Sequence, residues 1–218
     1  FGKGIRTGAR DAILSDETTP ANKGKIFGFH RSMDTLGAVI GPSLALLYLW
    51  FWPGDYKTLF FIAFIPGVLA ISTSLYLKEK IKPSGSPERK TRFFSFLYYG
   101  KNSPSAYKKL VLGLLVFSLF NSSDVFLLLK AKDAGMNDSA VVGVYIFYNL
   151  VYALFSYPVG VIADKVGLKT IFISGLLIFS LIYSGMAVNS NLYLFYGLFF
   201  LYGIYAAAGE GISKAWID

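Results

Sequence analysis

Apolar side chains gather into long blocks along the chain. Six stretches of about 20 residues are almost entirely apolar, and short polar segments separate them. At 1.5 Å per residue, a helix of about 20 residues crosses the roughly 30 Å hydrocarbon core of a bilayer. The pattern therefore predicts membrane-spanning helices at about 26–50, 58–77, 109–129, 139–163, 170–188 and 192–213.

The first segment, from Phe1 to about Leu14, is too polar to span a membrane by itself. We expect it to be the end of a preceding helix that runs into a loop. The chain starts inside this pattern, without a charged leader and a short apolar run. We therefore expect a fragment of a longer protein, truncated at both ends.

The composition fits a protein embedded in lipid. Hydrophobic residues make up 54% of the chain and charged residues 16%, whereas a soluble domain carries about 25% charged residues. The sequence has no cysteine, a single histidine and no Gly-rich phosphate-binding loop followed by lysine. We expect an all-α, polytopic transmembrane helical bundle with no cofactor and no metal.

The basic residues that give the chain its net charge of +8 are distributed unequally between the two sides of the predicted spans. All basic residues except Lys57, Lys130 and Lys132 lie on one side of them, and basic residues are retained on the cytoplasmic side of a membrane. We predict a multi-pass protein of the cell membrane whose cytoplasmic side carries both chain ends and the loops 15–25, 78–108 and 164–169. Because the basic residues occupy short loops rather than one soluble face, we expect no nucleic acid partner.

The loop 78–108 divides the chain into two parts. It is rich in proline and in basic residues, as is typical of a flexible linker between bundles. Ordinary topology explains its charge better than specific recognition of anionic lipid, which stays open as an alternative. We expect residues 1–77 to belong to an N-terminal bundle, 78–108 to be the basic cytoplasmic interdomain linker, and 109–218 to belong to a C-terminal bundle.

The most specific motif lies at residues 160–169. The sequence GVIADKVGLK resembles the loop signature GxLADRxGRK of the major facilitator superfamily (MFS), found between helices 2 and 3 and echoed between helices 8 and 9. Leu168 stands where a basic residue is usual and Lys165 where arginine is usual, which suits the weaker second copy. The resemblance implies that the six spans are helices 5 to 10 and that residues 1–14 end helix 4.

A second motif, GAVIGP at residues 37–42, resembles the GxxxGPxxG pattern of helix 5 in proton-coupled exporters of this family, with Ala45 in place of the last glycine. Gly37 and Gly41 lack side-chain bulk, and Pro42 deletes a backbone hydrogen bond. These three residues either pack tightly or form a conformational hinge of helix 5. The resemblance implies two bundles that rock about a central site.

The resemblance also assigns a role to the loop at 160–169. It implies that Asp164 approaches the start of the span near Lys25, where a carboxylate can accept hydrogen bonds from exposed N–H groups. Such a contact would hold one conformation of the transporter closed. A static helix cap is the alternative. The candidate latch residues are Gly160, Asp164, Lys165, Gly167 and Lys169.

Ionisable residues inside the spans are a stronger functional signal, because a charge near the bilayer centre is costly. His30, Arg31 and Asp34 share one helix face near the cytoplasmic start of the first span. A carboxylate beside an imidazole can exchange a proton near neutral pH. We therefore expect these residues to serve in proton coupling or as a cytoplasmic gate, with a structural ion pair as the alternative.

Asn121 and Asp124 belong to a polar run in the outer half of the span 109–129. A polar cluster inside an apolar span is expected to face a cavity rather than lipid. We expect both residues to line the substrate cavity and to bind a cationic or hydroxyl-bearing solute. The alternative is that Asp124 only pairs with Lys130 near the outer surface.

Further charged residues lie at the predicted cytoplasmic ends of the first and last helices. They are either parts of a cytoplasmic gate or surface residues. Glu210 either pairs with Lys3, at the corresponding position of a weak internal repeat, or snorkels to the surface. These candidate gate residues are Arg6, Arg10, Asp11 and Glu210.

These features predict a monomeric secondary active transporter whose partners are the lipid bilayer, a small organic solute and protons. The pattern at 37–42 favours proton-coupled export. Two alternatives stay open: proton symport that takes up a sugar, nucleoside or organic acid, and a transport-inactive membrane receptor or scaffold. We expect no enzymatic activity, since no nucleophile–base pair or metal cluster stands out.

Overall fold

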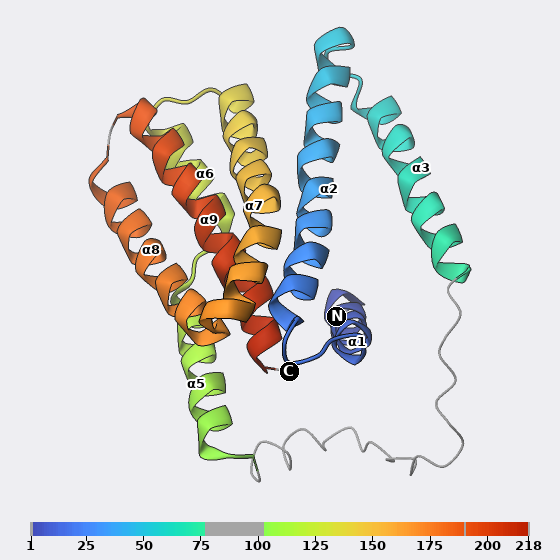
Figure 1. The fold of residues 1–218 in the computed structure, drawn as a ribbon. Coiled ribbons are helices and arrows are strands. Elements are labelled where there is room, and N and C mark those ends of the chain that lie inside the picture. Colours follow the sequence, from blue (N-terminus) through green and yellow to red (C-terminus); the bar gives the residue numbers. More distant parts are fainter. Residues whose placement is uncertain (1, 77–102, 190, 218) are drawn as a thin grey trace. The chain divides into compact units, whose positions relative to one another are not determined.

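The computed structural model describes residues 2–76, 103–189 and 191–217, and every regular element in these ranges is an α-helix (Figure 1). Long apolar helices without a strand in the described ranges confirm the predicted all-α polytopic fold. The helices are α1 (Gly2–Asp16), α2 (Lys23–Phe51), α3 (Tyr56–Leu75), α5 (Ser105–Phe120), α6 (Asp124–Asp133), α7 (Asp138–Val166), α8 (Leu168–Val188) and α9 (Leu192–Ile217).

Six stretches of the described chain are long and apolar enough to cross a membrane. Five of them are single helices that match predicted spans. The sixth, predicted as one helix over 109–129, is interrupted, because the chain leaves the helical form over 121–123 and resumes as α6. The local cause is a new helix start, at which the Ser123 side chain accepts a hydrogen bond from the Val125 N–H.

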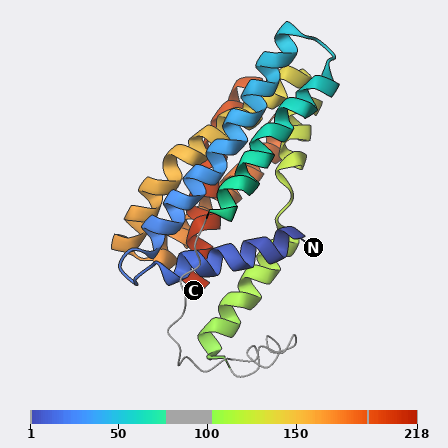
Figure 2. The ribbon, with the colours of Figure 1, turned by 90° about the vertical axis from the view of Figure 1, so that its right-hand side faces the viewer.

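Two further predictions concern the first segment of the chain and the linker that was expected after the second span. Residues 2–16 form the helix α1, which lies crosswise to α2 (Figures 1 and 2). The predicted linker 78–108 lies outside the described residues up to position 102, and α5 begins at Ser105. The division into an N-terminal and a C-terminal bundle stays a prediction.

The described helices group into two compact units, which we treat separately. Unit 1 contains Phe1–Leu47 and Ser123–Asp218, and unit 2 contains Tyr48–Ser122. Unit 2 holds the turn between α2 and α3, where the Tyr48 hydroxyl donates to Asp55 Oδ2 at 2.8 Å. Hydrogen bonds from Thr58 and Tyr48 lower the pKa of the partly exposed Asp55 carboxyl.

The core of unit 1 lies where α9 packs along both α7 and α8. Large side chains such as Phe195, Phe199 and Ile182 are fully buried there. A glycine brings two of these helices close, because a Cβ added at Gly203 would lie 2.7 Å from the carbonyl oxygen of Tyr148. Helices in lipid associate through such close packing, since lipid tails remove the hydrophobic driving force between them.

Small residues also bring α2 against α7. A Cβ added at Gly28 would lie 2.5 Å from the Ser156 carbonyl oxygen. One turn further along α2, the Ser32 hydroxyl donates to the Ala153 carbonyl at 2.6 Å. The buried residues of α2 are confined to its first half: Gly24, Phe27, Gly28, Ser32 and Thr35. Within unit 1, α2 is therefore packed at its N-terminal half.

This contact generates a prediction for stability. Gly28→Ala places a methyl group against backbone atoms that cannot rotate away, so we expect the free energy of unfolding of the full-length protein to fall by about 1–3 kcal/mol. Thermal unfolding in detergent measures this. Gly143→Ala on α7 is the matched control, since nothing lies within 4 Å of a Cβ there. Equal unfolding midpoints for the two variants would contradict the close α2–α7 contact.

Candidate functional site

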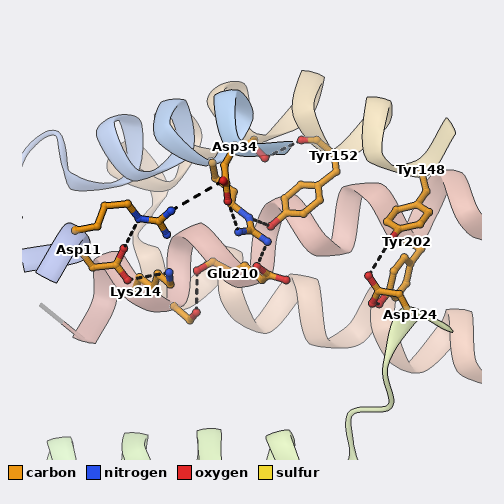
Figure 3. Close-up of polar contacts among 12 residues, drawn as sticks. Asp11, Asp34, Asp124, Tyr148, Tyr152, Tyr202, Glu210 and Lys214 are labelled. Atoms are coloured by element: carbon orange, nitrogen blue, oxygen red, sulfur yellow. Dashed lines mark hydrogen bonds and ion pairs between the residues drawn. The ribbon is translucent and has the colours of Figure 1, made fainter. Parts of the chain in front are cut away.

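Arg31 on α2 contacts residues of α7 and α9 in a charged cluster, and Figure 3 labels its partners Asp34, Tyr152 and Glu210. Its guanidinium donates to the hydroxyl of Tyr152, to the carboxylate of Glu210 and, at 3.0 Å, to the carboxylate of Asp34. A guanidinium carries five N–H donors in a planar fork, so one side chain can serve three partners. Arg31 therefore ties α2 to both α7 and α9.

Helix α1 extends this cluster through two further residues. Arg10 Nη1 lies 3.9 Å from Asp34 Oδ1, and Lys214 Nζ on α9 lies 2.8 Å from Asp11 Oδ2. Cations and carboxylates alternate through the cluster and are equal in number, so its charges compensate one another. We call this cluster the ionic network: Arg10, Asp11, Arg31, Asp34, Tyr152, Glu210 and Lys214.

The ionic network brings together most of the residues that the sequence marked as gate candidates. Asp34 contacts Arg31 and Arg10, and no hydrogen bond joins it to His30 among the described residues, although both side chains are partly exposed. Glu210 contacts Arg31. The side chains of Lys3 and Arg6 lie outside the described part of the chain, so the proposed Lys3–Glu210 pair is untested.

Sequence reasoning missed two members of the network. Tyr152 is one of 15 tyrosines, and only its position one turn after Tyr148 on the same helix face distinguishes it. Lys214 follows Glu210 by four residues, a spacing that often marks an ion pair within a helix. Here Lys214 instead reaches across to Asp11 on α1.

Asp164 lies at the start of α2, where the resemblance placed it. Its Oδ1 accepts the Gly24 N–H at 2.7 Å, and its Oδ2 accepts the Lys25 N–H at 2.8 Å. One carboxylate from α7 thus satisfies two of the N–H groups that a helix start leaves without an intrahelical partner. The negative charge also lies at the positive end of the α2 dipole.

The other residues of this loop have different surroundings. A Cβ at Gly160 would overlap the Gly24 carbonyl oxygen, so only glycine permits this approach of α7 to α2. Gly167 has φ +106° at the junction of α7 and α8, a conformation that favours glycine. Lys165 and Lys169 are exposed.

Asp124 forms a second polar centre, further along α7 and α9 (Figure 3). The Tyr148 hydroxyl donates to its Oδ2 at 2.8 Å, and the Tyr202 hydroxyl donates to its Oδ1 at 2.5 Å. The predicted alternative partner, Lys130, does not contact it among the described residues. Asn121, three residues earlier in the chain, is exposed and belongs to unit 2.

The predicted hinge residues lie in open surroundings. Nothing described lies within 4 Å of a Cβ added at Gly37 or Gly41. Pro42 lies inside α2, which continues as a helix to Phe51. Tight packing at these glycines is therefore absent from the described part of the chain, and the hinge role stays a prediction.

Long apolar helices with paired charges between them define an integral, multi-pass membrane protein. The family model of the Major Facilitator Superfamily matches residues 1–148. The chain belongs to this superfamily of membrane transporters.

The chain is similar to an uncharacterized MFS-type transporter, MJ1317 of Methanocaldococcus jannaschii, with 35% identity over 224 residues. The match covers 100% of this chain and 54% of that protein, so the chain spans about half the length of this relative. An uncharacterized protein of Mycobacterium tuberculosis, Rv2265, is 29% identical over 80 residues, which are 37% of this chain and 20% of that protein. No solved structure matches significantly.

The contact of Asp164 with α2 generates a second prediction. Asp164→Asn removes the charge and replaces one acceptor oxygen by an NH2 group. Loss of a helix cap costs about 0.5–2 kcal/mol, so amide hydrogen exchange over residues 24–28 should accelerate by roughly 2- to 30-fold. Asp133→Asn, at an exposed carboxylate on α6, is the control and should leave exchange in this segment unchanged. Equal exchange in both variants would show that the cap is not formed in solution.

Proposed function

We propose that the full-length protein is a secondary active transporter that works by alternating access and exports a small organic solute in exchange for protons. Membership of the superfamily supports transport in general. The ionic network supports the finer mechanism, because it can act both as a gate and as a site of proton exchange.

The observation that carries this proposal is the set of partners around Arg31. They come from α7 and α9, whereas Arg31 lies on α2. In the helix numbering implied by the resemblance, α2 is helix 5 of the N-terminal bundle, and α7 and α9 are helices 8 and 10 of the C-terminal bundle. Arg31 would then join the two bundles, and a rocking movement would have to break its contacts.

The distribution of basic residues supports a cytoplasmic position for this gate. Lys23, Lys25, Lys165 and Lys214 lie at the same end of α2, α7 and α9 as the network, and basic residues mark the cytoplasmic side. In this proposal the structure corresponds to a state closed toward the cytoplasm. The Asp164 contact with the start of α2 is a latch that stabilises the same state.

Proton exchange at Asp34 would couple the gate to a proton gradient. The Asp34 side chain is 45% exposed, so water can reach it, and it contacts two arginines. Protonation removes its negative charge and with it the attraction to Arg31 and Arg10, which loosens the network. In this proposal His30, one turn earlier on α2, passes a proton to or from Asp34.

The direction of transport rests on the motif at residues 37–42, which is the part of the chain that resembles proton-coupled exporters. Gly37 and Gly41 lie beyond the packed first half of α2. In the proposed mechanism α2 bends at Gly37, Gly41 and Pro42 while its first half opens and closes against α7. This arrangement lets the gate move without disrupting the whole helix.

Asp34→Asn tests proton coupling directly. Asparagine keeps the size of the side chain but cannot carry a proton, so we expect solute-dependent proton flux in proteoliposomes to fall to the level of protein-free liposomes. The internal pH is recorded while a panel of solutes is added, with and without an imposed proton gradient. Asp138→Asn is the control, since this exposed carboxylate pairs with Lys132, at 2.7 Å, and with no other basic side chain among the described residues. Unaltered flux and protein level in Asp34→Asn would remove Asp34 from the mechanism.

A further inference from the structure

The contact between α2 and α7 has two flanks of different character. Gly24 and Gly28 belong to the row of α2 that lies against α7. Successive residues of a helix are rotated by about 100° around its axis, so Arg31, with its charged partners, lies on one flank of this row. Phe29 and Met33 lie on the other flank. The proposed gate occupies the first flank and leaves the second without a role.

The second flank is hollowed by a groove of about 490 Å³. This volume falls in the range of about 300–1,000 Å³ that ligand pockets occupy. The ring of Tyr157 on α7 stands edge-on to that of Phe29 on α2, with 6.1 Å between the ring centroids. Both helices therefore border the groove, and its lining residues are Lys25, Ile26, Phe29, Ser32, Met33 and Tyr157.

Most of this lining is apolar, and the described part of the chain leaves much of it uncovered. Phe29 is 54% exposed and Met33 is 49% exposed. The lining residues of α2 extend from Lys25 to Met33, which is about 12 Å at 1.5 Å per residue. A groove of this kind on a membrane-spanning helix offers space for part of a lipid acyl chain, because burial of its CH2 groups favours binding.

Lys25 places a positive charge at one end of the groove. It lies in the first turn of α2, at the end that the basic residues mark as cytoplasmic. Its backbone N–H is bonded to Asp164 Oδ2 at 2.8 Å, but its exposed ammonium forms no ion pair with a carboxylate among the described residues. A lysine can cover apolar surface with its stem and hold its charge at the level of the lipid head groups.

We propose that this groove binds an anionic phospholipid, with the phosphate at Lys25 and one acyl chain along Phe29 and Met33. Basic pockets between spanning helices on the cytoplasmic side bind anionic lipid head groups. A helix covering the groove would fill its apolar part but would leave the charge of Lys25 without a partner unless it also placed a carboxylate there. A single phospholipid supplies both parts, and its binding depends on neither the direction nor the coupling of transport.

A lipid in this groove also acts on the contact between the two helices. Because α2 and α7 both border the groove, the bound lipid touches both, and it binds best while they are in contact. A ligand that binds one state better than another stabilises that state. The lipid therefore stabilises the α2–α7 contact from the flank opposite to the ionic network. Only this consequence rests on the movement described under the proposed function.

Photolabelling of the full-length protein in detergent tests the site without any transport step. The probe is a phosphatidylglycerol with a diazirine group on one acyl chain, and mass spectrometry locates the labelled peptides. We expect label on the α2 segment 25–33 and on the α7 peptide that contains Tyr157. Unlabelled phosphatidylglycerol should compete roughly fivefold better than phosphatidylcholine with the same acyl chains, because only the first carries a net negative charge.

Two pairs of variants separate the head group from the acyl chain. Lys25→Gln should reduce the preference for phosphatidylglycerol to about twofold or less, whereas Lys23→Gln, which removes the same charge from nearly the opposite side of α2, should retain it. Met33→Trp fills the apolar part of the groove and should strongly reduce labelling. Leu44→Trp, on α2 outside the groove, is its control. All four side chains are at least partly exposed, so we expect the variants to fold.

Amide hydrogen exchange over residues 24–28 measures the effect of the lipid on the helix contact. Phosphatidylglycerol should slow exchange by about twofold or more relative to phosphatidylcholine in the wild type. Lys25→Gln should abolish this difference. Unchanged exchange with the lipid bound would overturn the stabilising effect.

The labelling experiments can overturn the site itself. Label on other spans but not on the groove would show that the rest of the protein or a second copy covers it. Equal competition by the two lipids in the wild type would exclude recognition of the head group, and equal lipid preference in Lys25→Gln and Lys23→Gln would remove Lys25 from the site. None of these measurements involves a solute or a proton gradient, so their failure leaves the proposed export function intact. Absence of proton flux likewise leaves the lipid site intact.

Discussion

Charges between helices in an apolar environment must be neutralised by partners, and the arrangement of unit 1 depends on how Arg31 meets this requirement. Its guanidinium takes one partner on its own helix and one on each of two neighbouring helices. Asp34 and Glu210 carry the compensating charge, so removing either carboxylate would leave the largely buried guanidinium poorly compensated. Because the contacts of Arg31 depend on the charge of its partners, they are reversible. A proton that neutralises a carboxylate, or an ion that replaces it, can release Arg31.

Small residues make this set of ion pairs possible. Gly24 and Gly28 on α2 meet Gly160 and Ser156 on α7 with backbone in contact, which brings the N–H groups of α2 within reach of Asp164. Bulkier side chains would separate the helices and leave both Asp164 and Arg31 short of their partners. The close backbone contact between α2 and α7 at these glycines thus sets the geometry of the charged contacts one to two turns away. The gate and the latch that we propose are two consequences of one close helix crossing.

The sequence predicted the elements better than the contacts. Hydrophobic blocks located the spans, and the motif at 160–169 placed Asp164 at the start of α2. The interruption at 121–123 was missed because Asn121, Ser122 and Ser123 are few and short, and a hydropathy pattern averages over them. Tyr148, Tyr152 and Tyr202 were missed for a different reason. Tyrosine is common at membrane interfaces, and only the tertiary fold shows which hydroxyl groups meet a carboxylate or a guanidinium.

Opening and closing of the α2–α7 contact is the central claim, and distances between spin labels on the full-length protein test it most directly. Labels at Ala21, just before α2, and Val166, at the end of α7, occupy exposed positions. We predict two populations of distances, the shorter one corresponding to the contact described here. Acidification or addition of a transported solute should shift weight between the two. A single distance distribution that is the same at every pH and with every solute would contradict alternating access at this contact.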